Sequence, residues 1–295
     1  FAICLPASTK EIYINSIDYS NEFQTFGCVD SDCNVYFWDY YITLKMSMNF
    51  KSPCIQHMIR YLKNHKTWLT VGKDFIIREY DLSKESPLIL EIEGHTQMVM
   101  DIIEIESPFA IASASMDSTI KLYSLVDKSE ISVLNDHCKG VRSLTYNPNF
   151  GGFIVSAGFE RNIYIWSPEV TYRKSLIGKL EGHTEIVSAV QFLNLKPYCV
   201  SVDEKFNVRF WDVRTQVCVQ VLANETNAQV PCFGLFVFPQ NPDIFVIKSK
   251  RMLFYETVKF EGPKNVKGGD KNEGEDITPI KCELNSYYLS FTIVT

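Results

Sequence analysis

The stretch Gly182-His183-Thr184-Glu185-Ile186-Val187, followed 24 residues after Val187 by the Trp of Phe210-Trp211-Asp212, decides the fold of this protein. It starts with a turn dipeptide, passes through two apolar runs and ends in an alternating strand closed by Trp-Asp. A single small sheet of this kind cannot bury both of its faces alone, so the unit is expected to recur along the sequence.

Two independent markers show that the unit recurs. An aromatic residue closes each third strand at intervals of 42 to 45 residues: Trp38, Tyr80, Tyr123, Trp166, Trp211 and Tyr255. An apolar residue opens each first strand: Ile14, Ile55, Val99, Val141, Val187, Val230 and Ile277. In the six units that have both markers, the two lie 24 or 25 residues apart. The sequence is therefore predicted to contain seven units.

Each unit is predicted to contain four strands. Between the markers lies a second apolar run, which ends at a turn carrying Asp32, Asp74, Asp117 or Glu160, three residues before the next strand's first apolar position. An acidic side chain suits a tight turn because it accepts hydrogen bonds from neighbouring backbone amides. A further short run follows the aromatic residue. Stretches with helical periodicity are absent, so the predicted fold class is all-β.

The units resemble WD repeats, the four-stranded blades of a β-propeller, with Gly-His near the start and Trp-Asp at the end. Gly94-His95, Asp136-His137 and Gly182-His183 correspond to the first signature, and Trp38-Asp39 and Trp211-Asp212 to the second. The resemblance covers practically the whole sequence. It implies that residues 1–295 form a single seven-bladed propeller of antiparallel blades.

The two ends of the sequence lead to further expectations. The seventh blade starts at Ile277, has Tyr287–Val294 as its second strand and lacks its third. The N-terminal strand Ala2–Leu5 completes it and closes the ring, which removes exposed strand edges. Residues 261–276, rich in Gly, Lys, Asp and Asn, are predicted to form a flexible loop between blades six and seven.

The WD-repeat resemblance implies a hydrogen-bonded network within each blade, formed by a His, a turn acid, a Ser or Thr and the closing aromatic. The residues given this structural role are His95, Asp117, His137, Glu160, Trp166, His183 and Trp211. The third and fourth units are expected to form partial versions of the network, and the fifth lacks its turn acid because Lys205 occupies that position, so that no unit carries the full set. A Ser-His-acid set that recurs from unit to unit indicates a structural role, whereas a catalytic set occurs once. No enzymatic activity is predicted.

Composition narrows the possible ligands. The formal net charge of −6 gives no electrostatic reason to bind nucleic acid or an anionic membrane, so neither is an expected partner. The nine cysteines have no zinc-binding spacing and are interpreted as reduced core thiols. No metal and no cofactor is predicted. The sequence has neither a signal peptide nor an apolar run long enough to span a bilayer, which favours a cytoplasmic location.

In propellers, residues just before and just after the start of strand one, and just before the turn acid, line the narrow face. Applied to blades three to five, this rule gives an apolar group around an arginine, the composition of an interface centre. The predicted partner-binding residues are Met98, Met100, Met116, Arg142, Phe159 and Ile186. An alternative is that these side chains fill the central channel or pack within the blades.

The predicted function is a non-catalytic scaffold that binds a protein or peptide partner on the narrow face, as part of a larger protein or multiprotein complex. Two alternatives stay open. Trp211-Asp212-Val213-Arg214 resembles the motif by which some WD-repeat substrate receptors dock onto a cullin-RING ubiquitin ligase, and a propeller hydrolase would need a solvent-open Ser-His pair. The runs 156–160 and 210–220 are similar to large multi-propeller WD-repeat proteins of cilia or the cytoskeleton.

Overall fold

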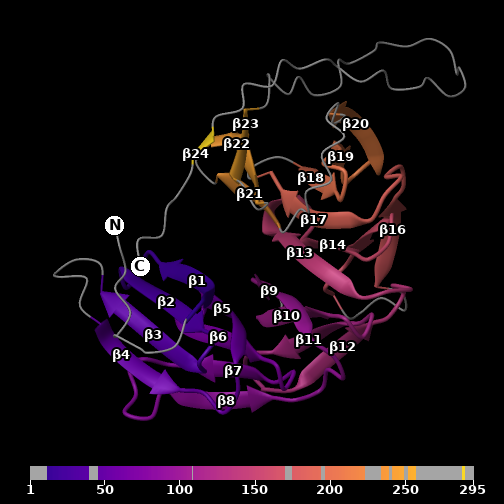
Figure 1. Ribbon diagram of the computed structural model, residues 1–295. Coiled ribbons are helices and arrows are strands. Elements are labelled where there is room, and N and C mark those ends of the chain that lie inside the picture. The colour runs from indigo at the N-terminus through magenta and orange to yellow at the C-terminus, as the bar shows by residue number, and fades with distance from the viewer. Residues whose placement is uncertain are drawn as a thin grey trace, which may run out of the picture. The chain divides into compact units, whose positions relative to one another are not determined.

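The computed structural model describes residues 12–39, 46–107, 109–169, 175–193, 197–222, 234–238, 241–248, 252–256 and 288–289. These residues form six four-stranded sheets, whose ladders are antiparallel, and contain a single turn of 3-10 helix, η1 (Pro148–Phe150) (Figure 1). The predictions of an all-β fold and of four strands per unit are confirmed over these described residues. All six closing aromatics lie in the third strands of their sheets.

The protein divides into two compact units. One unit holds the described residues up to Glu104 together with Ser115–Asp117, and the other holds Ile105–Ala114 and the described residues from Ser118 onward. The first unit contains two complete sheets, each in sequence order: β1 (Ile14–Ser20), β2 (Thr25–Asp30), β3 (Asn34–Asp39) and β4 (Met46–Lys51), then β5 (Gln56–Leu62), β6 (Thr67–Gly72), β7 (Ile77–Tyr80) and β8 (Leu88–Ile92).

The other four sheets follow the same order. They consist of β9 (Val99–Ile105), β10 (Ala110–Ser115), β11 (Ile120–Ser124) and β12 (Glu130–Leu134); β13 (Val141–Asn147), β14 (Phe153–Gly158), β15 (Ile163–Trp166) and β16 (Leu176–Leu180); β17 (Val187–Phe192), β18 (Tyr198–Asp203), β19 (Val208–Asp212) and β20 (Val217–Leu222); and β21 (Gly234–Phe238), β22 (Asn241–Lys248), β23 (Met252–Glu256) and β24 (Tyr288–Leu289).

The turns from second to third strands repeat one backbone feature. Two residues before the first apolar residue of the third strand, the backbone takes a positive φ at a non-glycine residue. The residues are Cys33 (66°), Phe75 (69°), Ser118 (70°) and Phe206 (63°). A left-handed residue tightens the turn at some cost in strain. The same turn geometry therefore recurs in four sheets although its side chains differ.

Neighbouring sheets of one unit bury apolar side chains against each other. In the first unit Phe37 of the first sheet meets the edge of Trp68 in the second, with ring centroids 5.2 Å apart. In the second unit Val155 and Ile165 of the fourth sheet share a buried cluster with Val187 and Trp211 of the fifth. This inter-sheet packing explains why the strands' apolar residues face both sides.

The C-terminal strand differs from its prediction. Tyr288–Leu289 was expected within the second strand of a seventh sheet, but it pairs with β23 as the fourth strand of the sixth, with Met252 opposite Leu289. A two-residue strand carries too little periodicity to reveal its partner from sequence. The predicted strand Ala2–Leu5, the unit starts Val230 and Ile277, and the loop 261–276 lie outside the described residues.

Candidate functional site

A recurring hydrogen bond defines the ends of the sheets where the partner site was predicted. In each of the first five sheets, one residue stands just before the turn-acid position and another just before the first strand. The backbone amide of the former donates to the backbone carbonyl of the latter. The pairs are Ser31 with Tyr13, Lys73 with Ile55, Met116 with Met98, Phe159 with Gly140, and Glu204 with Ile186, at 2.9 to 3.0 Å. Two of the three positions named by the sequence rule thus lie side by side in the first, third, fourth and fifth sheets, whereas in the second sheet Lys73 lies beside Ile55, which the rule took as the start of the strand.

A β-bulge accounts for the third position. The pairing register of the first strand shifts right after its opening residue, between Ile14 and Ser16, Gln56 and Met58, Val141 and Ser143, and Val187 and Ala189. Bulges re-aim the residue that is left out of the ladder. In the first unit the bulged Asn15 Nδ2 donates to the Gln56 carbonyl at 2.8 Å, and the bulged His57 Nε2 to the Val99 carbonyl at 2.5 Å.

In the fourth sheet, which belongs to the second unit, the bulged residue is Arg142, whose guanidinium lies over the Phe159 ring at 5.8 Å from its centroid. The Val187 amide donates to the Glu160 carbonyl at 3.0 Å, which ties the segment beginning at Ile186 to the turn that carries Phe159. All three side chains are half-buried. The structure brings Arg142 and Phe159 into contact, on the turn to which the Ile186 segment is bonded.

The predicted methionines belong to the first unit, apart from the arginine group. Met116 and Met98 are neighbours through their backbone hydrogen bond, and Met100 lies two residues after Met98 in the sequence. All three are half-buried. The six predicted partner-binding residues therefore fall into a methionine group in the first unit and an arginine group in the second.

The register predicted for the second sheet was wrong by one residue. Its first strand begins at Gln56, which pairs with Gly72, and not at Ile55. Apolar character favoured Ile55, but Gln56 is completely buried because its amide is satisfied. Gln56 Nε2 donates to Ser52 Oγ at 2.7 Å, and Thr70 Oγ1 donates to Gln56 Oε1 at 2.8 Å. Sequence reasoning missed this network because it replaces the His-Ser pair found in the fourth and fifth sheets.

The fifth sheet contains a complete polar network. His183 Nδ1 lies 3.1 Å from Asp203 Oδ2, and His183 Nε2 lies 2.7 Å from Ser201 Oγ. The Trp211 indole donates to the same hydroxyl at 2.8 Å. Burial alone would raise the pKa of Asp203, but hydrogen bonds from His183 and Asn207 outweigh it and hold that pKa below its usual range.

The expectation that this sheet lacks its turn acid was therefore wrong. The acid is Asp203, the last residue of β18, two residues before the position where Lys205 stands. Asp203 accepts the backbone amides of Lys205 and Asn207, at 3.0 and 2.9 Å, while Lys205 pairs with Glu185 on the surface. A fixed spacing from the third strand could not find it, because the acid is supplied from the strand end.

The fourth sheet uses its predicted residues and adds a tyrosine. His137 Nδ1 lies 2.6 Å from Glu160 Oε1, and His137 Nε2 lies 2.7 Å from Ser156 Oγ, which also accepts the Trp166 indole at 2.7 Å. Tyr164 donates to Glu160 Oε2 at 2.8 Å. Burial opposes the charge on Glu160, yet these hydrogen bonds hold its pKa below the usual value.

His95 and Asp117 meet in the first unit, where His95 Nδ1 lies 2.9 Å from Asp117 Oδ2. The Thr96 amide donates to the same oxygen at 3.0 Å. The carboxylate thus fixes both the imidazole and the loop that enters β9.

The Asp203-His183-Ser201 set has the connectivity of a hydrolase triad, but its environment opposes catalysis. Ser201 has no exposed surface, and its oxygen already accepts the Trp211 indole. Ser156 is equally buried and holds the same position in the fourth sheet. A nucleophile must reach the substrate, so both serines act here as hydrogen-bond junctions.

Arg214 does not extend freely from the sheet. Its Nη2 lies 3.0 Å from Oδ2 of the buried Asp212, and its Nε lies 3.3 Å from Oδ1. The guanidinium is about half exposed and bonds to the aspartate of its own motif.

The cysteines within the described ranges are free thiols. Burial raises the pKa of Cys199 and raises that of Cys28 to about 12, so both stay protonated. Cys138 differs from the predicted core placement because it is exposed. No cluster of three or more His, Cys, Asp or Glu suited to a metal ion, and no helix able to cross a membrane, occurs in the part of the sequence that the structure describes.

Comparison with known proteins supports the repeat assignment. Residues 86–124, 128–167 and 174–212 match the family model "WD domain, G-beta repeat". A relative, Cilia- and flagella-associated protein 337 B from Tetrahymena thermophila, is 27% identical over 205 residues, which are 68% of this chain and 15% of the relative. Nuclear distribution protein nudF from Aspergillus flavus is 32% identical over 130 residues, 44% of this chain and 28% of that protein.

The matched regions span less than a third of the length of either relative. Each matched repeat covers the last strand of one sheet and the first three strands of the next, and together they include the third, fourth and fifth sheets' first three strands, where the His-acid pairs were found. The first two sheets share the same strand order, bulge and turn bond, although the family model matches only β8 of their strands. On these grounds the protein contains three WD repeats within residues 86–212.

Proposed function

We propose that this protein is a non-catalytic interaction scaffold that binds a protein or peptide partner at the strand-start ends of its sheets, which form the narrow face of a seven-bladed propeller. The arrangement of Arg142 over Phe159 carries this proposal. A half-buried aromatic ring paired with a guanidinium, next to an aliphatic residue, is the composition of a binding hot spot.

The bulge at Arg142 supports the same role. The corresponding residues Asn15 and His57 use their side chains to bond the neighbouring strand, whereas Arg142 stacks on its own sheet's turn. The methionine group of Met98, Met100 and Met116 offers a second, adaptable contact surface, since thioether groups fit irregular partners.

The test replaces Phe159 with Asp in the full-length protein and compares partners by affinity purification and mass spectrometry. Val126→Asp is the matched control, because Val126 is 70% exposed, lies in the same unit and is remote in sequence from the proposed site. We expect Phe159→Asp to remove the principal partner and Val126→Asp to keep it. If a folded Phe159→Asp variant still recovered the same partners, the proposal would be wrong. Met98→Asp tests the methionine group separately.

We also propose a cytoskeletal or ciliary setting, as part of a larger protein or complex, because one relative is named for cilia and flagella and another for nuclear distribution. Purification from ciliated cells should then recover cytoskeletal proteins. Docking onto a ubiquitin-ligase adaptor gains no support, since Arg214 bonds to Asp212 and neither of these relatives is named for that role.

A further inference from the structure

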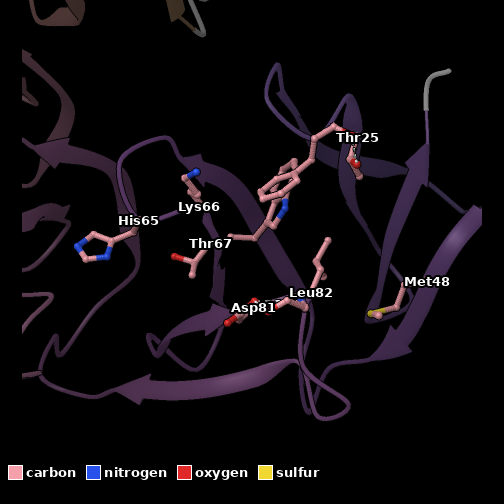
Figure 2. A pocket seen from close by; sticks show the side chains of 10 residues that line it. Thr25, Met48, His65, Lys66, Thr67, Asp81 and Leu82 are labelled. Atoms are coloured by element: carbon pink, nitrogen blue, oxygen red, sulfur yellow. Dashed lines mark hydrogen bonds between the residues drawn. The ribbon is translucent and has the colours of Figure 1, made fainter.

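A cavity of about 640 Å³ opens in the first unit, at the ends of the strands away from the turn acids. It is bordered by the turn from β1 to β2, the turn from β5 to β6 and the segment after β7 (Figure 2). Phe23, Met48, Trp68 and Leu82 form its apolar wall. A cavity of this size suits a small molecule or a few residues of peptide.

The charged groups beside the cavity already have partners. Lys66 Nζ lies 2.5 Å from Glu22 Oε1. Asp81 accepts the Ser83 hydroxyl at 2.6 Å and lies 3.6 Å from Lys84 Nζ. A charged occupant would lose hydration without gaining a free counterion here, so the cavity favours a neutral one.

One strong donor remains unpaired. Trp68 is only 1% exposed, and its Nε1 has no hydrogen-bond partner among the described residues. The indoles of Trp166 and Trp211 both donate to serine hydroxyls, so an unpaired buried indole stands out within this protein. Trp68 Nε1 is shielded from water, and Met48 and Leu82, which line the cavity, pack against the cluster that contains Trp68, so a bound acceptor would reach Nε1 by displacing one of these flexible side chains.

Two hydroxyls of the cavity wall complement this donor. Thr25 Oγ1 donates to the Phe23 carbonyl at 3.0 Å, and Thr67 Oγ1 donates to Glu79 Oε1 at 2.9 Å. Each hydroxyl proton is used, which leaves oxygen lone pairs as acceptors. A peptide offers a partner for each of these features. Its backbone carbonyl can accept from the indole N–H, its backbone amide can donate to a hydroxyl oxygen, and an apolar side chain can pack on the apolar wall.

We propose that this cavity binds a neutral, apolar peptide segment of a protein partner, whose backbone carbonyl accepts a hydrogen bond from Trp68 Nε1–H. This second interaction surface does not depend on the strand-start site, and loss of one leaves the other intact.

The probe is the capped tripeptide acetyl-Leu-Ala-Leu-amide, titrated into the full ¹⁵N-labelled protein and followed by NMR of its four tryptophan indole groups. The Trp68 signal is the one missing from the Trp68→Phe variant. We expect that signal to move downfield with saturation, while the Trp166 and Trp211 signals stay in place. Versions of the peptide with Lys or Asp in place of Leu should bind at least about tenfold more weakly.

Two variants make the result decisive. Trp68→Phe removes the donor but keeps an aromatic ring, and Leu82→Asp places a charge in the wall but keeps the indole donor. Both should weaken tripeptide binding about tenfold, the free-energy equivalent of one hydrogen bond, whereas Ile177→Asp, an exposed change in the other unit, should not. An unmoved Trp68 signal, or wild-type affinity in either folded variant, overturns the proposal. If Trp68→Phe does not fold, Leu82→Asp decides.

Discussion

At the scale of single residues, the carboxylate of Asp203 accepts several hydrogen bonds that stabilise the turn after β18. It accepts from His183, from two backbone amides and from the Asn207 side chain, and is only 1% exposed. A buried carboxylate is stabilised only while such donors surround it, and the donors in turn depend on it.

We predict that Asp203→Ala lowers the free energy of unfolding by about 3–5 kcal/mol, because it leaves His183 and two amides without an acceptor. Lys205→Ala should change it by less than about 0.5 kcal/mol, since the Lys205 ammonium is exposed and pairs with Glu185 at the surface. Urea unfolding of both variants measures the difference. If both variants lost the same free energy of unfolding, the Asp203 carboxylate would not be what stabilises this turn.

His57 gives the first unit a distinct pH dependence. Burial lowers the pKa of its imidazole; the bond to the Val99 carbonyl and the nearby Asp74 oppose that shift, and Lys73 adds to it. His57 Nδ1 has no partner among the described residues, so protonation would bury a new unpaired charge. A histidine whose pKa is lower when folded contributes stability that is complete above its unfolded value, about 6.5, and is lost as the pH falls below it.

The expected result is a decline in unfolding free energy between about pH 7.5 and pH 5.5 that is shallower in His57→Gln than in the wild type. Carboxylates such as Asp203, whose pKa values are lowered in the folded protein, lose their contribution to the free energy of unfolding only below about pH 4. Denaturant titrations at several pH values separate the two windows. Identical slopes in both proteins would contradict the role of His57.

At the scale of strands, a glycine in β2 allows the first two sheets to approach each other. A Cβ placed on Gly27 would lie 2.6 Å from Trp68 Cζ3 and 2.8 Å from Ile59 Cδ1. Both contacts are shorter than atoms tolerate, so the large indole fills the space that the glycine leaves.

Gly27→Ala should therefore destabilise the protein by about 1–3 kcal/mol through overpacking. Trp68→Leu removes the obstructing ring, and the double variant should recover at least about 0.5 kcal/mol relative to the sum of the single effects. A double-mutant cycle by thermal or urea unfolding measures this coupling. Strict additivity would mean that the two side chains do not share the space.

Periodicity predicted the strands well, because two-residue alternation and the closing aromatic act locally. In the first five sheets it predicted the first residue of the first strand correctly four times. The exception is the second sheet, whose first strand starts at the buried polar residue Gln56 and not at an apolar residue. Periodicity also could not reveal the bulges, since they arise from pairing between strands. The contact between Arg142 and Phe159 depends on such a bulge, so the sequence suggested the residues but not their arrangement.

At the scale of the whole molecule, the repeat is more widespread than its signature residues. The His-acid pairs occur in the third to fifth sheets, and the family model matches strands of these sheets together with β8, the last strand of the second. The first and second sheets keep the backbone plan with other polar sets, Asp30 with Asn34 in one and Gln56 with Thr70 in the other. Backbone geometry thus persists where the side chains that identify it have been replaced.

The two placements of the turn acid also suggest a route by which such repeats diverge. The first sheet has acids at both positions: Asp30 is buried and accepts the amides of Asp32 and Asn34, while Asp32 lies at the surface near Lys51. A repeat with this double set can lose the surface acid and arrive at the pattern of the fifth sheet. Ancestral repeats could therefore change the position of the turn acid by single substitutions, because one carboxylate remains at the turn throughout.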